Sequence, residues 1–355
     1  MNKNIWEPIA SVGDMAEWAG ASESDLKEAE AELLPEGRSG LRIKGWLVES
    51  SKRPILGSLA REEYVNSEES FSSLSFFGIG QVGVDLCNYR LTVRVMLQCN
   101  PRCHPVMAME ALGLEKELGV SHLPEMVFGG SALCLLHEGS GVKLHYNAVD
   151  ALKGWMEEAL PPVEVPAAAK WKFRSKPSQQ VILDYDYTFT TPYSGSETLD
   201  TEPEKTNPEE YHRLYWQECD EQIDLTVLSK KEPILFYNEV VLYEDELADN
   251  GVSLLTVKVR VMPSGWFLLL RYWLRVDGVL MRLRDTRVYC AFSSDDKEMP
   301  VIIREICWRE ATIHSLSTKG FPSDSTAYMD PNPISQKLPI IKHKSQRLIL
   351  SRSAD

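Results

Sequence analysis

The sequence predicts an α+β protein that is dominated by antiparallel β-sheet, with a few helices packed on one side. Two observations favour this fold class. The second half of the chain contains six closely spaced runs with strand character: Val181–Thr190, Ile234–Tyr243, Leu254–Met262, Trp266–Val276, Val279–Val288 and Val301–Trp308. Leu255, Val257 and Val259 alternate with polar residues, which is typical of a half-buried strand. Strands this close in sequence, with no helix between them, must pair antiparallel.

The first half of the chain predicts short helices and one strand. After a polar segment 1–24, which we expect to be disordered, Ser24 is a candidate N-cap for a helix Asp25–Leu34 that Pro35 ends. Leu41–Val48 has the pattern of a strand. Ser58–Tyr64 has the composition expected at the start of a second helix.

The middle of the chain predicts a hairpin, a helix and two loops. Ala132–His137 and Val142–Tyr146 alternate around the turn 138–141. Asn147 is a good N-cap for a helix that extends to about Ala159, with Asp150 as its third residue. We expect surface loops at 163–180, which carries prolines with small and basic residues, and at 194–210, which is acidic and predicted to be mobile.

The chain is predicted to form a single domain over residues 25–350. The stretch 65–111 differs from the rest because it is poor in charged residues and has no helical period. We therefore interpret 65–111 as an insert in this domain.

Composition restricts the class of partner. The formal net charge is -14, and both nucleic acid and anionic membranes select basic surfaces. A protein or a cation is the expected partner. The seven cysteines are scattered and odd in number, and the first residues lack the apolar core of a signal peptide, so we expect reduced thiols in the cytosol or nucleus. The longest apolar run, Trp266 to Leu270, is far shorter than the roughly 20 residues that span a bilayer.

One stretch matches a nucleotide-binding motif by letter only. Residues 78–83 fit the pattern G-x-G-x-x-G, which requires a following helix and an acidic residue about 20 positions later. Here residues 84–96 alternate like a strand, and no acid occurs between Val95 and Met109. We interpret the match as chance and expect no cofactor.

The candidate metal ligands are also incomplete. Cys99, Cys103 and His104 form at most half of a zinc site, because a structural site requires four ligands. In the predicted hairpin, His137 faces Val142 and His145 faces Cys134, which places the two histidines on opposite faces. We therefore expect no bound metal and no shared histidine site.

Several long strings resemble the TIP-41-like family. They are SHLPEMVFG at 121–129, EDELADNGVS at 244–253, VKVRVMPS at 257–264 and FLLLRYWLRVDGVLMRLRDTR at 267–287. The stretch 163–193 is similar to the plant form of the family. The resemblance covers residues 25–350 except for the insert. In the family, the helix that begins at Ser58 continues directly into 113–121, so the insert interrupts one helix.

The resemblance implies a regulator of target-of-rapamycin (TOR) signalling without catalytic activity of its own. It implies antiparallel sheets with helices to one side, and a cleft that receives the C-terminal tail of the catalytic subunit of type 2A protein phosphatases. The TAP-42/alpha-four regulator is implied as a further partner. Neither a cofactor nor a metal is implied.

Four positions are implied in phosphatase contact by the resemblance: Asp150, Ile223, Leu283 and Ile306. Leu283 and Ile306 depart from the animal pattern, which has methionine and tyrosine there. A structural role is the alternative at each position. Asp150 stabilises its helix through the helix dipole by roughly 0.3 to 1 kcal/mol with or without a partner. Isoleucine and leucine are most often buried in a core.

The residues of the predicted hairpin around Asp277-Gly278 indicate a basic patch. A two-residue type I′ turn sets Trp273 opposite Arg282, Arg271 opposite Arg284, and Arg275 opposite Leu280. These six side chains would share one face. Directly opposed arginines disfavour pairing unless anions lie between them. The anions are either acids from neighbouring strands or the carboxylate-ended tail of a partner.

Two other classes of function stay open at this point. One is a hydrolase or transferase with an unrecognised active site, and the other is a structural adaptor in a larger assembly. No esterase elbow, P-loop or H-E-x-x-H sequence supports an enzyme. A phosphatase-binding regulator is the interpretation that we favour.

Overall fold

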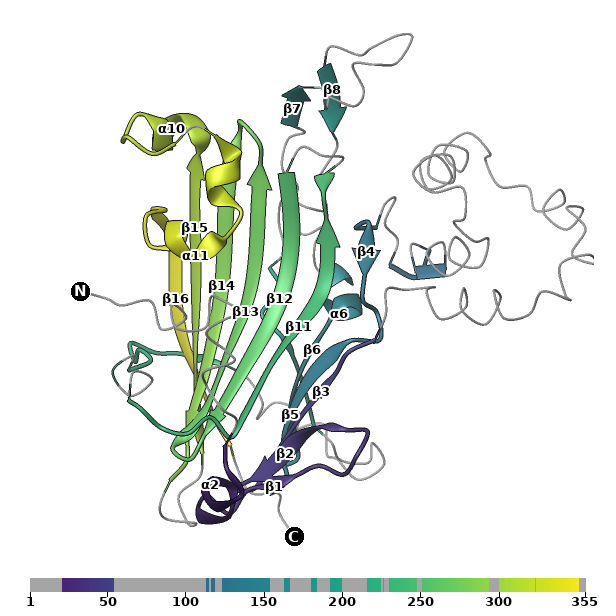
Figure 1. The fold of residues 1–355 in the computed structure, drawn as a ribbon, viewed down its shortest axis with the longest axis vertical. Coiled ribbons are helices and arrows are strands. Elements are labelled where there is room, and N and C mark those ends of the chain that lie inside the picture. Colours follow the sequence, from purple (N-terminus) through teal and green to yellow (C-terminus); the bar gives the residue numbers. More distant parts are fainter. Residues whose placement is uncertain are drawn as a thin grey trace, which may run out of the picture.

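Two antiparallel β-sheets pack face to face in this protein (Figure 1). The computed structural model describes residues 21–53, 113–114, 116–118, 123–153, 163–166, 180–183, 192–199, 216–224, 226, 230–247, 251–293, 300–322 and 324–350. The predicted fold class is confirmed, since these residues are mostly strands with a few short helices.

The large sheet has eight strands and the small sheet has six. In spatial order the large sheet comprises β10 (Gln217–Glu218), β16 (Ile340–Ile349), β15 (Val301–Thr312), β14 (Leu280–Ala291), β13 (Gly265–Val276), β12 (Gly251–Met262), β11 (Phe236–Asp245) and β4 (Met126–Val127). The small sheet comprises β1 (Glu32–Leu33), β2 (Ser39–Ile43), β3 (Trp46–Ser51), β5 (Ala132–His137), β6 (Val142–Asn147) and β9 (Ser196–Leu199). A separate pair is formed by β7 (Val163–Pro166) and β8 (Gln180–Leu183).

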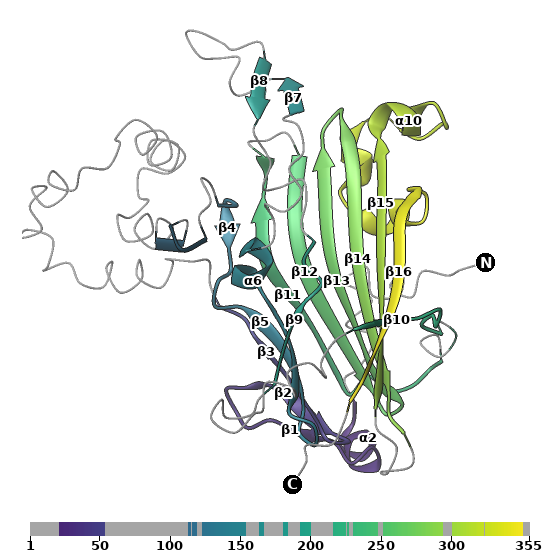
Figure 2. The ribbon, with the colours of Figure 1, turned by 180° about the vertical axis from the view of Figure 1, so that it is seen from behind.

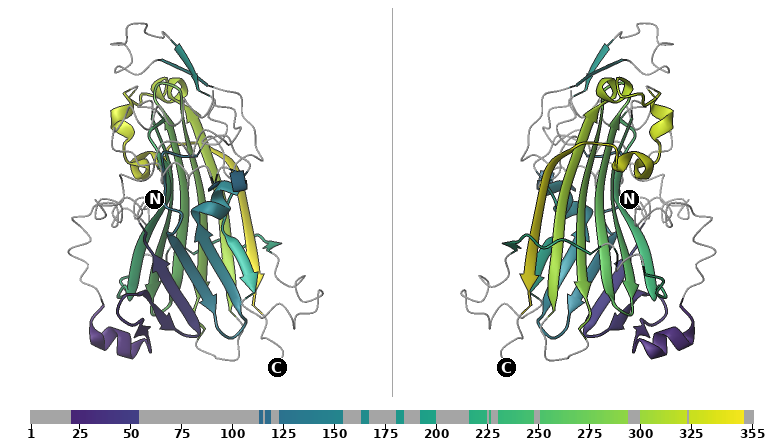
Figure 3. Two further views of the ribbon diagram at one scale, coloured as in Figure 1. Left: turned by 90° about the vertical axis from the view of Figure 1, so that its right-hand side faces the viewer. Right: turned by 90° about the vertical axis from the view of Figure 1, so that its left-hand side faces the viewer.

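Short helices flank the two sheets (Figure 1). They are α2 (Glu23–Glu28), α6 (Ala148–Lys153), α10 (Ile313–Ser317), the 3₁₀ helix η6 (Ser325–Tyr328) and α11 (Pro331–Ser335). The small sheet covers one face of the large sheet, and α10 and α11 lie on the other (Figures 1 and 3).

The main core fills the space between the two sheets. Trp46 of the small sheet meets Trp266 of the large sheet edge to face, with ring centroids 5.0 Å apart, and both side chains are almost fully buried. Such a pair contributes about 0.5–1.5 kcal/mol beyond the area that it buries. A second core lies under α10 and α11, where Trp273, Leu283 and Leu316 pack together. Both faces of the central strands are therefore covered by protein.

The predicted strands of the second half and the hairpin at 132–147 are confirmed. Each of the six apolar runs contributes to a strand, although the first is described only up to Leu183. In the hairpin, His137 pairs with Val142 and Cys134 pairs with His145, as predicted. The N-cap at Asn147 is also confirmed, because its side-chain oxygen accepts a hydrogen bond from the amide of Asp150 at 2.9 Å.

The first predicted helix begins earlier and is shorter than expected. Ser22, not Ser24, is the N-cap, and it forms a capping box with Asp25. Glu30 has a φ of 54°, which ends the helical path well before Leu34. The next residues pair with β2 as strand β1.

The predicted strand Leu41–Val48 is wrong in one respect, because it is a hairpin. Lys44 and Gly45 have φ values of 47° and 75°. Positive φ at two consecutive residues is the mark of a type I′ turn, which reverses the chain between β2 and β3. The alternation of apolar residues continues across the turn, so it concealed the reversal.

Both predicted loops begin or end in strands. The stretch 163–180 starts with β7, which pairs with β8, and the acidic stretch 194–210 starts with β9. Residues 200–210 lie outside the described residues, as do most of segment 1–24, the helix start at 58–64, the insert 65–111 and the continuation of α6 to Ala159. The domain limits and the insert stay predictions.

Candidate partner-binding face

The turn between β13 and β14 differs from the prediction by one residue. Val276 pairs with Leu280, so the turn has three residues, and the amide of Val279 donates to the carbonyl of Val276 at 3.0 Å. Only Gly278 has a positive φ, 74°, whereas a type I′ turn needs positive φ at both central residues. The predicted two-residue turn is therefore wrong, and every side chain of β14 lies on the face opposite to the one predicted.

The corrected register replaces the opposed arginines with an ion pair. Arg271 lies opposite Asp285, and its Nε and Nη2 donate to the two carboxylate oxygens, each at 2.8 Å. The side chains are only 7 % and 5 % exposed. Burial alone would raise the pKa of Asp285, but the neighbouring Arg271 holds that pKa below its ordinary value. Of the two alternatives left open by the sequence, an internal acid is the correct one for Arg271.

Trp273 and Arg275 share the face of Arg271, under the C-terminal helices. Trp273 is opposite Leu283, and both are buried in the second core. Arg275 is opposite Met281, and it donates to Asp277 at 2.9 Å and to the carbonyl of Tyr328 at 3.2 Å. These residues hold α10, η6 and α11 on the sheet.

Arg282 and Arg284 point to the other face, the one that faces the small sheet. They share this face with Tyr272 and Leu274 of the main core. Arg282 donates to Glu310 at 2.6 Å. The predicted single-faced patch of Arg271, Trp273, Arg275, Arg282 and Arg284 is therefore wrong, because one register shift divides it between two faces.

An aromatic side chain that the sequence did not single out lies beside Arg284. Trp308 of β15 is directly opposite Arg284 on one side and Lys342 of β16 on the other. The guanidinium carbon of Arg284 and Nζ of Lys342 both lie 3.9 Å from the centroid of the Trp308 ring. Cations over an indole are attracted by about 0.5–2 kcal/mol. We call Arg282, Arg284, Trp308 and Lys342 the basic strip.

The basic strip lies toward the α10 end of the large sheet, beyond the edge strand of the small sheet. Arg304 of β15 donates to Glu197 of β9 at 2.8 Å and stacks on Trp216. Ile306 and Trp308 follow on the same face, and they are half-buried, while Lys342 is exposed. This part of the face is accessible to a partner through the side chains of Trp308 and Lys342.

The four positions implied by family resemblance are not brought together. Ile306 lies on the face of the basic strip, opposite Lys344. Leu283 is fully buried in the second core. Ile223 is 5 % exposed in a third small core, and its amide donates to Glu305 at 2.7 Å. Core packing accounts for Leu283 and Ile223, and any contact between them and a partner stays a prediction.

Asp150 lies at the start of α6, in a partly exposed polar cluster. Its carboxylate accepts from the side chains of Asn147 at 2.7 Å and Ser196 at 2.8 Å, and Lys153 lies 3.5 Å away. Burial would raise the pKa of Asp150, but these hydrogen bonds and Lys153 bring the pKa below its ordinary value. The pKa of the neighbouring His145 is lowered by burial and by Lys143. Asp150 is thus a fixed, ionised acceptor at neutral pH.

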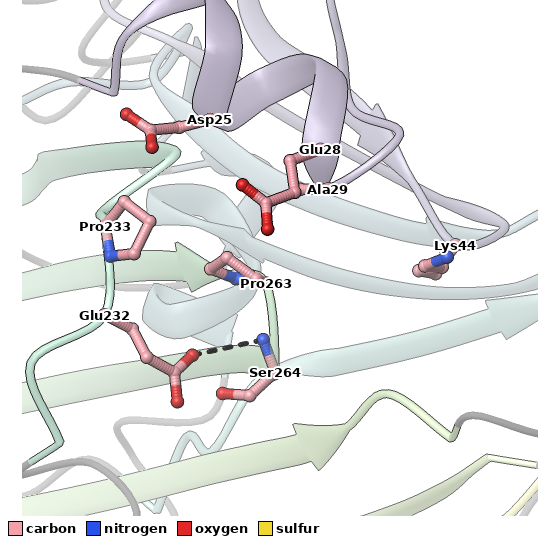
Figure 4. Close-up of a pocket in the computed structure, with 8 residues that line it drawn as sticks. All are labelled: Asp25, Glu28, Ala29, Lys44, Glu232, Pro233, Pro263 and Ser264. Atoms are coloured by element: carbon pink, nitrogen blue, oxygen red, sulfur yellow. Dashed lines mark hydrogen bonds between the residues drawn. The ribbon is translucent and has the colours of Figure 1, made fainter.

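A hollow of about 550 Å³ lies at the other end of the molecule, beside α2 (Figure 4). Two of the acids that line it, Asp25 and Glu232, are engaged locally. Asp25 belongs to the capping box, and Glu232 accepts from the amide of Ser264 at 3.3 Å. Lys44 is bound to Glu30 at 2.7 Å. These contacts stabilise the start of α2 and the turn at Ser264.

Potential metal ligands do not gather in the described part of the chain. No group of three or more His, Cys, Asp or Glu side chains in these residues is arranged to hold a metal ion. Cys219, Cys290 and Cys307 are free thiols. The motif at 78–83 and Cys99, Cys103 and His104 lie outside the described residues. No described helix is long and apolar enough to cross a bilayer.

Comparison with known proteins decides the family. The model of the TIP41-like family matches residues 126–317, which contain β4 through α10 and three residues of the basic strip. The chain belongs to the TIP41-like family. Lys342, the fourth residue of the basic strip, lies beyond the matched segment.

Relatives with the family name occur across eukaryotes. The chain is 56 % identical to a TIP41-like protein of Arabidopsis thaliana, over 91 % of this chain and 95 % of that protein. It is 37 % identical to a TIP41-like protein of Homo sapiens, over 72 % of this chain and 87 % of that protein. It is 32 % identical to a Saccharomyces cerevisiae protein named type 2A phosphatase activator TIP41, over 69 % of this chain and 70 % of that protein.

Proposed function

We propose that this chain is a regulatory protein without catalytic activity that binds the catalytic subunit of type 2A protein phosphatases and changes their activity. The observation that carries the proposal is the name of the yeast relatives, which are type 2A phosphatase activators. We also propose a contact, a pathway and a location. The chain binds the C-terminal tail of the catalytic subunit, and it acts in TOR signalling together with the TAP-42/alpha-four regulator. It works in the cytosol or nucleus.

The basic strip is the contact that we propose for the tail. In a chain of net charge -14, the guanidinium of Arg284 and the ammonium of Lys342 lie over one indole ring. Arg282 and Arg284 are buried, so the exposed Lys342 and the half-buried Trp308 are the side chains that a partner reaches. Arginine and lysine bind carboxylates through charge-assisted hydrogen bonds, and tryptophan is frequent among residues that dominate binding energy. An extended tail with a terminal carboxylate matches this chemistry. Ile306 adds an apolar surface next to the strip.

Binding of a purified type 2A catalytic subunit tests this proposal, with affinity measured by calorimetry. Lys342→Glu and Trp308→Ala should each weaken binding by about tenfold or more, because both remove side chains that a ligand can reach. Lys319→Glu is the matched control. It makes the same charge change at an exposed residue after α10, on the opposite face, and should leave the affinity unchanged. Thermal unfolding of each variant separates lost binding from lost folding.

The outcomes distinguish the two levels of the proposal. If the unmodified chain fails to bind the catalytic subunit, the regulator function is wrong. If it binds but Lys342→Glu binds equally well, the basic strip is not the contact. A catalytic subunit without its C-terminal tail should bind more weakly than the intact subunit. Binding with no change in phosphatase activity would favour a structural adaptor.

A further inference from the structure

The edge strand β16 is paired along only part of its outer edge. Strand β10 pairs with Arg347 and Gln346, and the amide of Cys219 donates to the carbonyl of Ser345 at 3.1 Å (Figure 2). The chain then turns away, and Ile223 packs on the face of the sheet. From Ile340 to Lys344, no described strand lies on this outer side.

The direction of the backbone groups follows from two hydrogen bonds. Leu350 donates to Pro300 on the side of β15, whereas the carbonyl of Ser345 points outward to Cys219. Along a strand, the N–H and C=O groups of successive residues point to alternate sides. His343, two residues before Ser345, therefore directs its N–H and C=O groups to the outer edge.

The side chains along this edge suit an acidic, partly apolar peptide. Ile340 and Ile341 are 55 % and 56 % exposed, and Lys342 and His343 are exposed as well. Lysine is common on edge strands as a protection against unwanted pairing. Two adjacent exposed isoleucines have the opposite effect, because they favour association. The edge thus combines apolar surface with positive charge.

The protein already places one acidic strand on this edge. Glu218 of β10 lies beside β16, and its carboxylate accepts from Nζ of Lys344 at 2.7 Å. A strand that continued along the line of β10 would meet Lys342, which projects from the same face as Lys344. Acidic residues at alternate positions of such a strand would face the lysines.

We propose that the open edge of β16, from Ile340 to Lys344, binds an extended acidic segment of a partner protein as an added β-strand. Main-chain hydrogen bonds to His343 hold the segment, acids at alternate positions pair with Lys342 and Lys344, and apolar residues cover Ile340 and Ile341. This surface shares Lys342 with the basic strip, but it differs from the strip because it uses the backbone edge of β16. The inference does not depend on phosphatase binding.

Proline at position 343 is the direct test. His343→Pro removes the outward N–H group but leaves the ladder between β16 and β15 intact, because proline is tolerated where the amide faces away from the sheet. His343→Val is the matched control, since it removes the same side chain and keeps the amide. The probe is a blocked, fluorescent peptide of about six alternating Glu and Val residues, and its binding is followed by anisotropy.

We expect saturable binding to the unmodified chain, about tenfold weaker binding to His343→Pro, and near-normal binding to His343→Val. Lys342→Glu should also weaken it, and a peptide with Lys in place of Glu should not bind. Thermal unfolding should show both position-343 variants folded.

Absent binding, or equal binding by the proline and valine variants, would overturn the proposal. So would a dimer in sedimentation that His343→Pro dissociates, which assigns the edge to a second copy. Peptide binding that appears only after deletion of residues 200–210 would assign the edge to this chain's own acidic segment.

Discussion

The Arg271–Asp285 pair shows how one buried charge constrains its neighbours. Taking an arginine and a carboxylate out of water costs several kcal/mol per ion, which their attraction offsets only when the hydrogen bonds are well formed. Both carboxylate oxygens are used here, and the guanidinium also donates to Asn332 of α11 at 2.7 Å. The pair thus links β13, β14 and α11 at one point. Its function is structural.

Asp285→Asn should therefore destabilise the protein, by about 3 kcal/mol near neutral pH, because it leaves Arg271 buried without a counter-charge. The pKa of Asp285 is lowered by folding. Its stabilising contribution is fully present above the unfolded pKa of about 3.9 and is lost as the pH falls through the lower folded value. In urea titrations, the difference in unfolding free energy between the unmodified protein and Asp285→Asn should decrease below about pH 4.

Asp277→Asn provides the comparison. Asp277 also pairs with an arginine, but its side chain is 34 % exposed, so its loss should cost at most about 1 kcal/mol. Equal losses for Asp277→Asn and Asp285→Asn would contradict a special role for the buried pair. A gap for Asp285→Asn that stays constant down to about pH 3 would contradict the titration argument.

The residues of the candidate site were only partly predictable. Arg282 and Arg284 were identified because a two-residue turn would set Arg284 directly opposite Arg271, and opposed like charges need anions between them. Their partners were not, since Trp308 and Lys342 lie in other strands whose alignment with β14 depends on the packed sheet. The face of Arg282 and Arg284 relative to β13 was predicted incorrectly because it depends on the length of one turn. A shift of one residue reverses the whole strand.

At the scale of elements, turns decide the register and have their own energetics. Gly278 has a φ of 74°, and a Cβ built there would meet no atom within 4 Å. The carbonyl of Val279 accepts from the amide of Ile313 at 2.9 Å, which ties the turn to α10. The three-residue turn thus fits both the sheet and the helix that follows β15.

Gly278→Ala should cost about 1–2 kcal/mol of unfolding free energy, since a Cβ disfavours left-handed backbone even where space is open. Gly278→Asn should cost less, because asparagine tolerates this conformation. Thermal or urea unfolding of the three proteins checks the order. If Gly278→Ala has the same unfolding free energy as the unmodified protein, the left-handed backbone at this turn does not limit which residue it accepts.

Most strands were predictable because apolar and polar residues alternate clearly along them. The strands that were missed have a weak alternation. Strands β12 to β15 carry long apolar runs that are buried on at least one face, so they were evident in the sequence. Strand β16 was missed because the segment from Ile340 to Lys344 is largely exposed, with lysine and histidine among its isoleucines. A two-residue strand such as β4 or β10 has too few residues to show a period.

At the scale of the whole molecule, the two sheets form a closed unit from segments that are distant in sequence. Arg53, the last described residue of the β3 segment, donates its amide to Ser131 Oγ at 2.8 Å, and the Ser131 hydroxyl donates to the carbonyl of Arg53 at 3.2 Å. Leu114 and Leu118 pack against the main core. The described residues on both sides of 54–112 are therefore anchored to the sandwich.

The prediction at this scale is that residues 65–111 are dispensable. A deletion that joins Tyr64 to Leu112 retains both anchors, Arg53 on Ser131 and Leu114 in the core, and it lies outside the segment that the family model matches. It also restores the uninterrupted helix that the family resemblance implies. The melting temperature should stay within about 2–4 °C of the full chain, the shift that 1 kcal/mol produces in a domain of this size.

Binding of the type 2A catalytic subunit by the deletion protein should agree with that of the full chain within about twofold. A matched deletion that also removes residues 113–118 is the control, and it should be less stable because Leu114 and Leu118 leave the core. If the 65–111 deletion is as unstable as this control, the stretch contributes packing of its own. If it folds normally but loses the phosphatase, the stretch belongs to the binding surface, and the interpretation of 65–111 as an insert is wrong.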